Sequence, residues 1–108
     1  MKVTIQMKAR PEKTQELDQT LHALLPAIRG ERGCRSCRVY RDLEDAGMSF
    51  LEIDWDGPTN LQKFMQSPRG GALLGAIDLL SESPRVNLGG KEPLAGISSL
   101  KKLRTKEK

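Results

Sequence analysis

Two β-rich runs, residues 34–43 and 48–55, constrain the fold of this 108-residue chain more than any other feature. Both contain the β-branched and aromatic residues that favour strands. The four residues between them, 44–47, end in a glycine that accommodates the positive φ of a tight turn. The pattern predicts a β-hairpin, and the rest of the chain must cover it.

Alternation along the two strands sorts their side chains onto opposite faces of the hairpin. The apolar face, which we expect to lie beneath helices, contains Cys37, Val39, Leu43, Leu51, Ile53 and Trp55. The other face mixes aromatic and charged groups and also holds Cys34, Asp42 and Met48. It is too apolar for solvent and too charged for a monomer core, so we expect a second copy of the chain to cover it. A solvated sheet face is the alternative, and the residues of the expected dimer face are Arg38, Tyr40, Phe50, Glu52 and Asp54.

The segments before the hairpin predict a strand and a helix. Residues 2–9 alternate between apolar and polar side chains, as a half-buried strand does. Pro11 and Glu12 suit the first turn of a helix, whose apolar stripe runs from Leu17 to Ile28. Pro26 removes a backbone donor, so this helix is expected to kink or end near Leu25.

The segments after the hairpin predict two helices and a strand. A short helix contains Leu61 and Phe64, and Ser67 followed by Pro68 suits the start of the next one. Pro84 is expected to end that helix, and residues 85–88 to form a last strand. The resulting β-α-β-β-α-β order predicts an α+β, ferredoxin-like fold, in which a four-stranded antiparallel sheet carries its helices on one face. We assign this domain to residues 1–90.

The positive charge of the chain lies in a basic C-terminal extension, residues 91–108. This extension carries six basic and two acidic side chains, whereas residues 1–90 carry twelve of each. The neutral domain makes a nucleic-acid surface unexpected. The extension forms either a docking helix, through apolar residues at every third position from Leu94, or a solvated tail. No apolar run is long enough for a membrane span, so we expect a cytoplasmic protein.

Three side chains are candidates for chemistry near neutral pH. His22 is the only histidine and the first choice for acid–base work, although it lies at the margin of the helix stripe. Cys34 and Cys37 form a C-x-x-C pair, which in a cytosolic protein indicates redox or metal chemistry. In an extended strand, however, their side chains point to opposite faces and cannot form a disulfide. We therefore expect two small apolar residues and no metal site.

The segments GCRSCRVYRDLED, FLEIDW and L-x-x-F-M-x-S-P resemble those of the antibiotic biosynthesis monooxygenase family. The resemblance covers residues 1 to about 90 and implies a dimeric α+β barrel of two ferredoxin-like sheets packed face to face. It also implies activity of the kinds found in the family, which are cofactor-independent oxidation of phenols or quinols and degradation of haem.

The resemblance gives Trp55 the place of the family's strand-end tryptophan, which lines the pocket between helices and sheet. The polar residues that accompany it in the phenol oxygenases are replaced here by Leu51 and Leu61. The haem-degrading members need an asparagine, a tryptophan and a histidine where this chain has Met7, Phe64 and Leu74. Haem would therefore lack its axial ligand, and no cofactor is expected.

These observations lead to one leading function and one alternative. The first is a homodimeric, cofactor-independent monooxygenase that acts on a small aromatic or quinol-type compound. Its catalytic candidates are His22 and Tyr40, and its expected pocket is lined by Trp55, Phe64, Leu51, Leu61, Leu74 and Arg69. The alternative is a non-catalytic dimer of the same fold that binds a small ligand or a partner.

Overall fold

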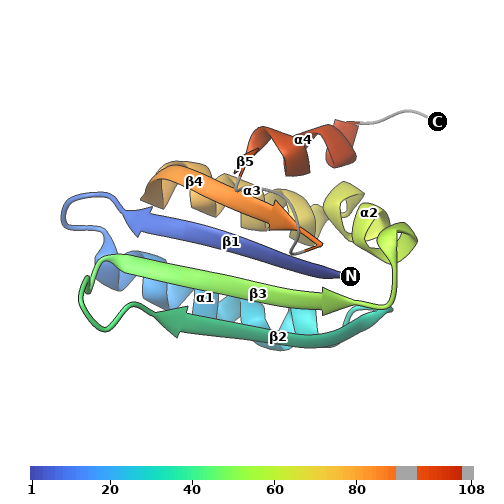
Figure 1. Ribbon diagram of the computed structural model, residues 1–108, viewed down its shortest axis with the longest axis horizontal. Coiled ribbons are helices and arrows are strands. Elements are labelled where there is room, and N and C mark those ends of the chain that lie inside the picture. Colours follow the sequence, from blue (N-terminus) through green and yellow to red (C-terminus); the bar gives the residue numbers. More distant parts are fainter. Residues whose placement is uncertain (90–94, 106–108) are drawn as a thin grey trace.

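The computed structural model describes residues 1–89 and 95–105. Figure 1 shows a sheet with its helices behind it and at one end. The elements follow in the order β1 (Lys2–Ala9), α1 (Thr14–Arg29), β2 (Cys34–Arg41), β3 (Met48–Trp55), α2 (Pro58–Gln66), α3 (Pro68–Leu80), β4 (Ser81–Leu88), β5 (Ala95–Gly96) and α4 (Ser98–Thr105).

The sheet is antiparallel and has the strand order β2-β3-β1-β4-β5. Helices α1 and α3 cover one face of it, while the other face carries no helix (Figure 1). The predicted α+β, ferredoxin-like fold is confirmed, with α2 and α3 together in the place of its second helix. A fifth strand, β5, extends the sheet by two residues beyond β4.

The core lies between the sheet and these helices. Alternation along β1 buries Val3, Ile5, Met7 and Ala9, as the sequence pattern predicts. The antiparallel register places Ile5 beside Leu51 of β3, so neighbouring strands contribute side chains to the same buried layer.

The start of α1 differs from the expectation. Pro11 and Glu12 lie in a turn that the Lys13 N–H closes by donating to the Arg10 carbonyl at 2.9 Å, and α1 begins at Thr14. Pro11 occupies the first central position of this turn, and Glu12, with a positive φ of 65°, occupies the second. These two features define a type II turn. At the other end, α1 continues through Pro26 for one further turn, so of the two expected outcomes, a kink or an end near Leu25, the end is wrong.

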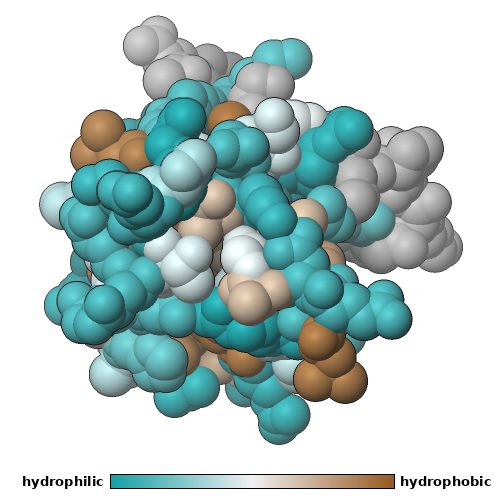
Figure 2. Space-filling view, turned by 90° about the vertical axis from the view of Figure 1, so that its left-hand side faces the viewer, coloured by the Kyte–Doolittle hydropathy of each residue, from teal (hydrophilic) through white to brown (hydrophobic). Residues whose placement is uncertain are grey.

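The end of β2 also differs. The strand stops at Arg41, and Leu43 is fully exposed instead of lying beneath the helices. The Asp42 carboxylate accepts hydrogen bonds from the N–H groups of Glu44 and Asp45, which turns the chain two residues early. Figure 2 looks onto this end of the molecule, whose surface is mainly hydrophilic with separate hydrophobic spots.

The last predicted strand is longer than residues 85–88, and Pro84 does not end α3. The helix stops at Leu80, and β4 begins at once with Ser81. The pairing of β4 with β1 shifts register between Gln6 and Lys8, opposite the segment that contains Pro84. An irregularity of this kind tolerates a residue that has no backbone donor.

Part of the C-terminal extension packs on the domain. Leu100 of α4 is fully buried, and Arg104 donates hydrogen bonds from Nη1 to the carbonyls of Met65 and Ser67, both at 2.7 Å. The prediction for residues 91–94 and 106–108 lies outside the described residues. Within residues 1–89 and 95–105, no helix has both the length and the apolar character that crossing a membrane requires.

Candidate functional site

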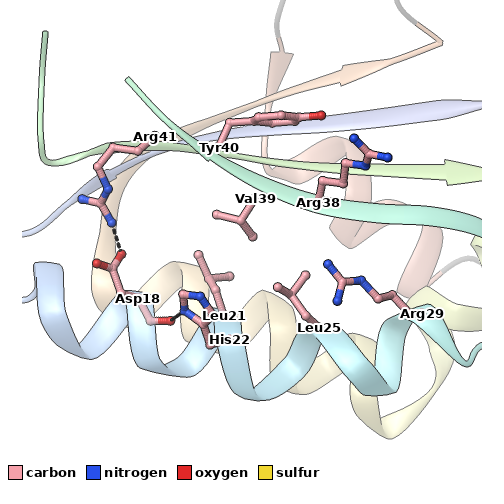
Figure 3. Close-up of a pocket in the computed structure, with 9 residues that line it drawn as sticks. All are labelled: Asp18, Leu21, His22, Leu25, Arg29, Arg38, Val39, Tyr40 and Arg41. Carbon is pink, nitrogen blue, oxygen red and sulfur yellow. Dashed lines mark hydrogen bonds and ion pairs between the residues drawn. The ribbon is translucent and has the colours of Figure 1, made fainter. Parts of the chain in front are cut away.

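A cavity of about 560 Å³ lies between α1 and β2, the edge strand of the sheet. Its floor is apolar, because Leu21 and Leu25 point up from α1 toward Val39 of β2 (Figure 3). Repetition of leucine at every fourth position of α1 keeps both leucines on one helix face. The arrangement gives the cavity an apolar floor.

Charged side chains close the two ends of this floor. At one end Arg41 of β2 forms an ion pair with Asp18 of α1 (Figure 3). At the other end Arg29 of α1 donates a hydrogen bond from Nε to the carbonyl oxygen of Cys37, at 2.9 Å. The cavity is therefore apolar in the middle and polar at both ends.

His22 lies on the rim of the cavity, where its side chain is exposed. Its Nδ1 lies 2.9 Å from the carbonyl oxygen of Asp18, one helical turn earlier. A carbonyl oxygen only accepts hydrogen bonds, so this contact requires the proton of a neutral imidazole to reside on Nδ1. Nε2 is then an acceptor that is able to take a proton from a ligand.

Tyr40 also borders the cavity, but its ring lies on the side of β2 that faces away from α1 (Figure 3). The register pairs Tyr40 with Phe50, on the helix-free face of the sheet, and its side chain is 45% exposed. The structure thus brings His22 and Tyr40 to one cavity without placing them on the same side of the strand. Of the two candidates, His22 is the one on the α1 side of the strand, where its ring lies against the helix beside Asp18 (Figure 3).

The free edge of β2 supplies main-chain groups to the same region. The Asp42 N–H donates to the Met48 carbonyl, so alternation places the main-chain groups of Tyr40 and Arg38 toward β3 as well. Those of Cys37, Val39 and Arg41 consequently point outward. The carbonyl of Cys37 is the one that accepts from Arg29.

A second hollow, of about 380 Å³, adjoins the cavity at its Arg29 end. Its lining residues are Arg29, Arg35, Ser36, Cys37 and Arg38. Arg29 and Arg35 were not among the predicted site residues, and Arg38 was assigned to the expected dimer face. The sequence does contain a pattern that could have indicated them, since an arginine occurs at every third position from Arg29 to Arg41. A search for basic residues interleaved with aromatic residues does not detect this pattern.

A β-bulge between Cys34 and Ser36 changes the expected placement of the cysteines. The register pairs Cys34 with Trp55 and Cys37 with Ile53, so both cysteines face the helices. The expectation that Cys34 lies on the opposite face is wrong. Burial raises the pKa of Cys37 to about 12 and also raises that of Cys34, which keeps both as thiols at neutral pH. Within residues 1–89 and 95–105, no cluster of three or more His, Cys, Asp or Glu side chains is placed to bind a metal ion.

The residues of the predicted Trp55 pocket are mostly core residues. Trp55 and Phe64 pack with ring centroids 5.4 Å apart at an interplanar angle of 36°. Trp55 is fully buried, and its Nε1–H makes no hydrogen bond to any described residue. An unpaired buried donor costs about 1–3 kcal/mol. The core also takes in Leu51, Leu61 and Leu74.

Arg69, the polar residue of that predicted pocket, points elsewhere. Its side chain is 61% exposed and forms an ion pair with Glu31 at 3.1 Å. The structure therefore brings together Trp55 and Phe64 but leaves Arg69 at the surface. A ligand site beside Trp55 stays a prediction.

Comparison with known proteins identifies the family of the chain. The family model for antibiotic biosynthesis monooxygenase matches residues 1–72. The chain belongs to this family. No match to the chain was found among the curated proteins.

Solved structures share the family fold at low sequence identity. An antibiotic biosynthesis monooxygenase superposes with a TM-score of 0.75 at 20% identity, over 85% of this chain and 98% of that one. Rv0793 from Mycobacterium tuberculosis gives 0.71 at 22% identity, over 84% and 95%. PA3566 from Pseudomonas aeruginosa gives 0.73 at 17% identity, over 80% and 87%. At these identities the likeness concerns the fold.

The helix-free face of the sheet holds the residues expected at a dimer interface. The register pairs Tyr40 with Phe50 and Arg38 with Glu52 across β2 and β3. Glu52 lies 3.9 Å from the Lys2 ammonium, and Asp54 lies 3.5 Å from the N-terminal ammonium. The two carboxylates of this face are therefore paired within one chain, whereas Arg38 forms no ion pair with a described residue. Covering of this face by a second copy remains a prediction.

Proposed function

We propose that this member of the antibiotic biosynthesis monooxygenase family oxidises a small quinol-type aromatic compound with O₂, in the cavity between α1 and β2. The observation that carries the proposal is the position of His22. Its Nδ1 contacts the Asp18 carbonyl, and its Nε2 remains able to accept a proton at the rim of the apolar floor.

The size and lining of the cavity support a ligand of this kind. A volume of about 560 Å³ falls within the range of small-molecule sites, roughly 300–1,000 Å³. Leu25 and Val39 offer apolar contact to an aromatic ring. The outward main-chain groups of Val39 lie at the same edge and are able to hydrogen-bond a hydroxyl substituent.

The reaction needs one base and a reducing substrate. Transfer of a phenolic proton to Nε2 of His22 leaves a phenolate, which is far more easily oxidised by O₂ than the phenol. One oxygen atom then enters the ring and the other leaves as water, so that a hydroquinone and O₂ give a hydroxyquinone and water. The substrate supplies all the electrons, and the part of this chain is to bind it and to accept the proton.

Oxygen uptake with a panel of quinols tests this function. We expect His22→Gln to lower kcat by about a hundredfold, since general-base catalysis contributes roughly 10²–10⁴-fold. Trp55→Phe, which removes the buried donor but keeps a ring, separates the two predicted sites. It leaves the rate nearly unchanged if the substrate binds between α1 and β2, and lowers the rate if the substrate binds beside Trp55.

The alternative is a non-catalytic module that binds a small aromatic ligand. It is favoured by one observation, that the Tyr40 ring lies across the strand from His22 and adds no second acid–base group beside it. Saturable binding of quinols by the wild type, without oxygen uptake for any of them, would contradict the oxidation and establish this alternative.

The resemblance and the family membership also support a homodimer. In our proposal the second copy covers the face that carries Arg38, Tyr40, Phe50, Glu52 and Asp54. The α1–β2 cavity opens at the edge of the sheet and shares Arg38 and Tyr40 with this face, so the second copy would border the cavity.

A further inference from the structure

We infer that the arginine-lined hollow beside the cavity binds a carboxylate, so that the ligand of this protein is an aromatic carboxylic acid. The hollow has a volume of about 380 Å³, and Arg29, Arg35 and Arg38 are among the residues that line it. The Arg29 side chain reaches β2 from α1, whereas that of Arg38 lies on the other side of β2 (Figure 3). The inference rests on the proposed function for the aromatic half of the ligand, and it adds the chemical class of the substrate.

The hollow and the cavity adjoin each other. Arg29 and Arg38 line both of them. Figure 3 shows the Arg29 guanidinium reaching from α1 toward β2, close to the end of the floor formed by Leu25. A ring lying on Leu25 and Val39 therefore directs a substituent toward the arginines.

Local backbone structure positions two of these arginines. Arg35 is the extra residue of the β-bulge, because the register passes from Cys34–Trp55 directly to Ser36–Asp54. A bulged residue leaves the ladder, so Arg35 extends into solvent at the strand edge. Arg29 is fixed through Nε by the Cys37 carbonyl at 2.9 Å, and this contact leaves its terminal N–H groups for a ligand.

The charge of the hollow is not neutralised by the residues that the structure describes. Among the residues that the structure describes, no carboxylate forms an ion pair with Arg29, Arg35 or Arg38. Arg41, at the far end of the cavity, differs because Asp18 pairs with it. Guanidinium groups match a carboxylate through paired N–H donors. An anion attached to an apolar ring thus complements both halves of the site.

Two ligands that differ only in charge test the inference, 2-naphthoate and its neutral amide, 2-naphthamide. We expect the wild type to bind 2-naphthoate about tenfold more tightly in a calorimetric or NMR titration, as charge-assisted hydrogen bonds at a partly exposed site predict. The preference should shrink as salt is added. Both ligands should shift the methyl signals of Leu25 and Val39.

Matched arginine variants locate the anion. Arg35→Gln should remove most of the preference for 2-naphthoate and leave binding of 2-naphthamide unchanged. Arg85→Gln removes the same charge from β4, on the far side of β3 and β1 from β2, and should change neither. Arg35 lies outside the expected dimer face, so its variant does not depend on the oligomeric state.

Equal affinity for the two ligands, or an equal effect of Arg35→Gln and Arg85→Gln, would overturn the inference. Oxygen uptake with 2,5-dihydroxybenzoate and hydroquinone separates this outcome from failure of the proposed function. Selective binding of 2-naphthoate without oxidation of either quinol supports the carboxylate site and overturns the oxidation. Equal oxidation of both quinols with no effect of Arg35→Gln supports the oxidation and overturns the carboxylate site.

Discussion

Asp45 shows how one residue joins the turn of the hairpin to the neighbouring strand. Its carboxylate accepts a hydrogen bond from the Lys8 ammonium of β1 at 2.6 Å and another from the Gly47 N–H at 3.1 Å. The Lys8 contact, followed by the Gly47 N–H, lowers the pKa of Asp45 below its ordinary value of 3.8. The charged form of Asp45 is therefore favoured in the folded state.

This pKa shift predicts a pH-dependent contribution to stability. Since the folded pKa lies below the unfolded one, the contribution is complete above about pH 4 and is lost as the pH falls through the folded pKa. We expect Asp45→Asn to be less stable than the wild type at neutral pH and equally stable in strong acid. Urea unfolding at a series of pH values measures the difference. Glu44→Gln, which removes the same charge in the same turn, should show no such convergence.

At the residue scale the sequence selected His22 and Tyr40 as separate candidates. Both border the cavity, and their catalytic role stays a prediction. The sequence could not group them with Arg29, because their proximity arises only where the edge strand meets α1. The bulge that exposes Arg35 has no distinctive sequence. The prediction therefore assumed regular alternation along the whole strand, and this assumption placed Cys34 on the wrong face.

At the scale of elements, the junction between α2 and α3 is held by unusually close contacts. The Ser67 hydroxyl donates to the Phe64 carbonyl at 2.6 Å and accepts from the Gly70 N–H at 3.1 Å. A Cβ on Gly70 would lie 2.1 Å from the Phe64 carbonyl oxygen. Backbone atoms cannot move aside as a flexible side chain does, so this position requires glycine.

We therefore predict that Gly70→Ala destabilises the protein by about 2–4 kcal/mol, the cost of overpacking a rigid contact. The melting temperature should fall by roughly 10 °C or more in a thermal scan followed by circular dichroism. Gly75→Ala is the matched control in the same helix, since nothing lies within 4 Å of its added Cβ. It should raise stability by about 0.5–1 kcal/mol through helix propensity. A melting temperature of Gly70→Ala at or above that of the wild type would contradict the prediction.

Sequence periodicity predicted which elements exist, whereas local interactions determine where each element begins and ends. The alternation of β1 and the leucine stripe of α1 were predicted correctly because each corresponds to one buried face. Pro11 was assigned to a helix, although a type II turn uses the same residue. The spacing of Leu100 and Leu103 left a docking helix and a solvated tail both open. The helix docks on α2 through tertiary contacts such as those of Arg104, which the spacing does not reveal.

At the scale of the whole molecule, the two faces of the sheet differ in how they are covered. Helices α1 and α3 lie on one face, and the other carries Tyr40 and Phe50 side by side without a helix over them (Figure 1). Tyr40 is 45% exposed. A pair of aromatic rings on an open sheet face is an efficient centre for an isologous interface.

We predict that the wild type is a dimer with twice the 12.0 kDa mass of the chain, as measured by sedimentation or light scattering. Phe50→Glu should give monomers, because burying an unpaired carboxylate at the centre of the interface costs about 3 kcal/mol or more, which weakens the dimer by at least about a hundredfold. Leu79→Glu is the control. It makes the same kind of change at an α3 side chain that is 74% exposed, away from the open sheet face, and should leave the dimer intact. If Phe50→Glu remains dimeric while folded, the copies meet through another surface, and the aromatic pair is only a solvated part of the sheet.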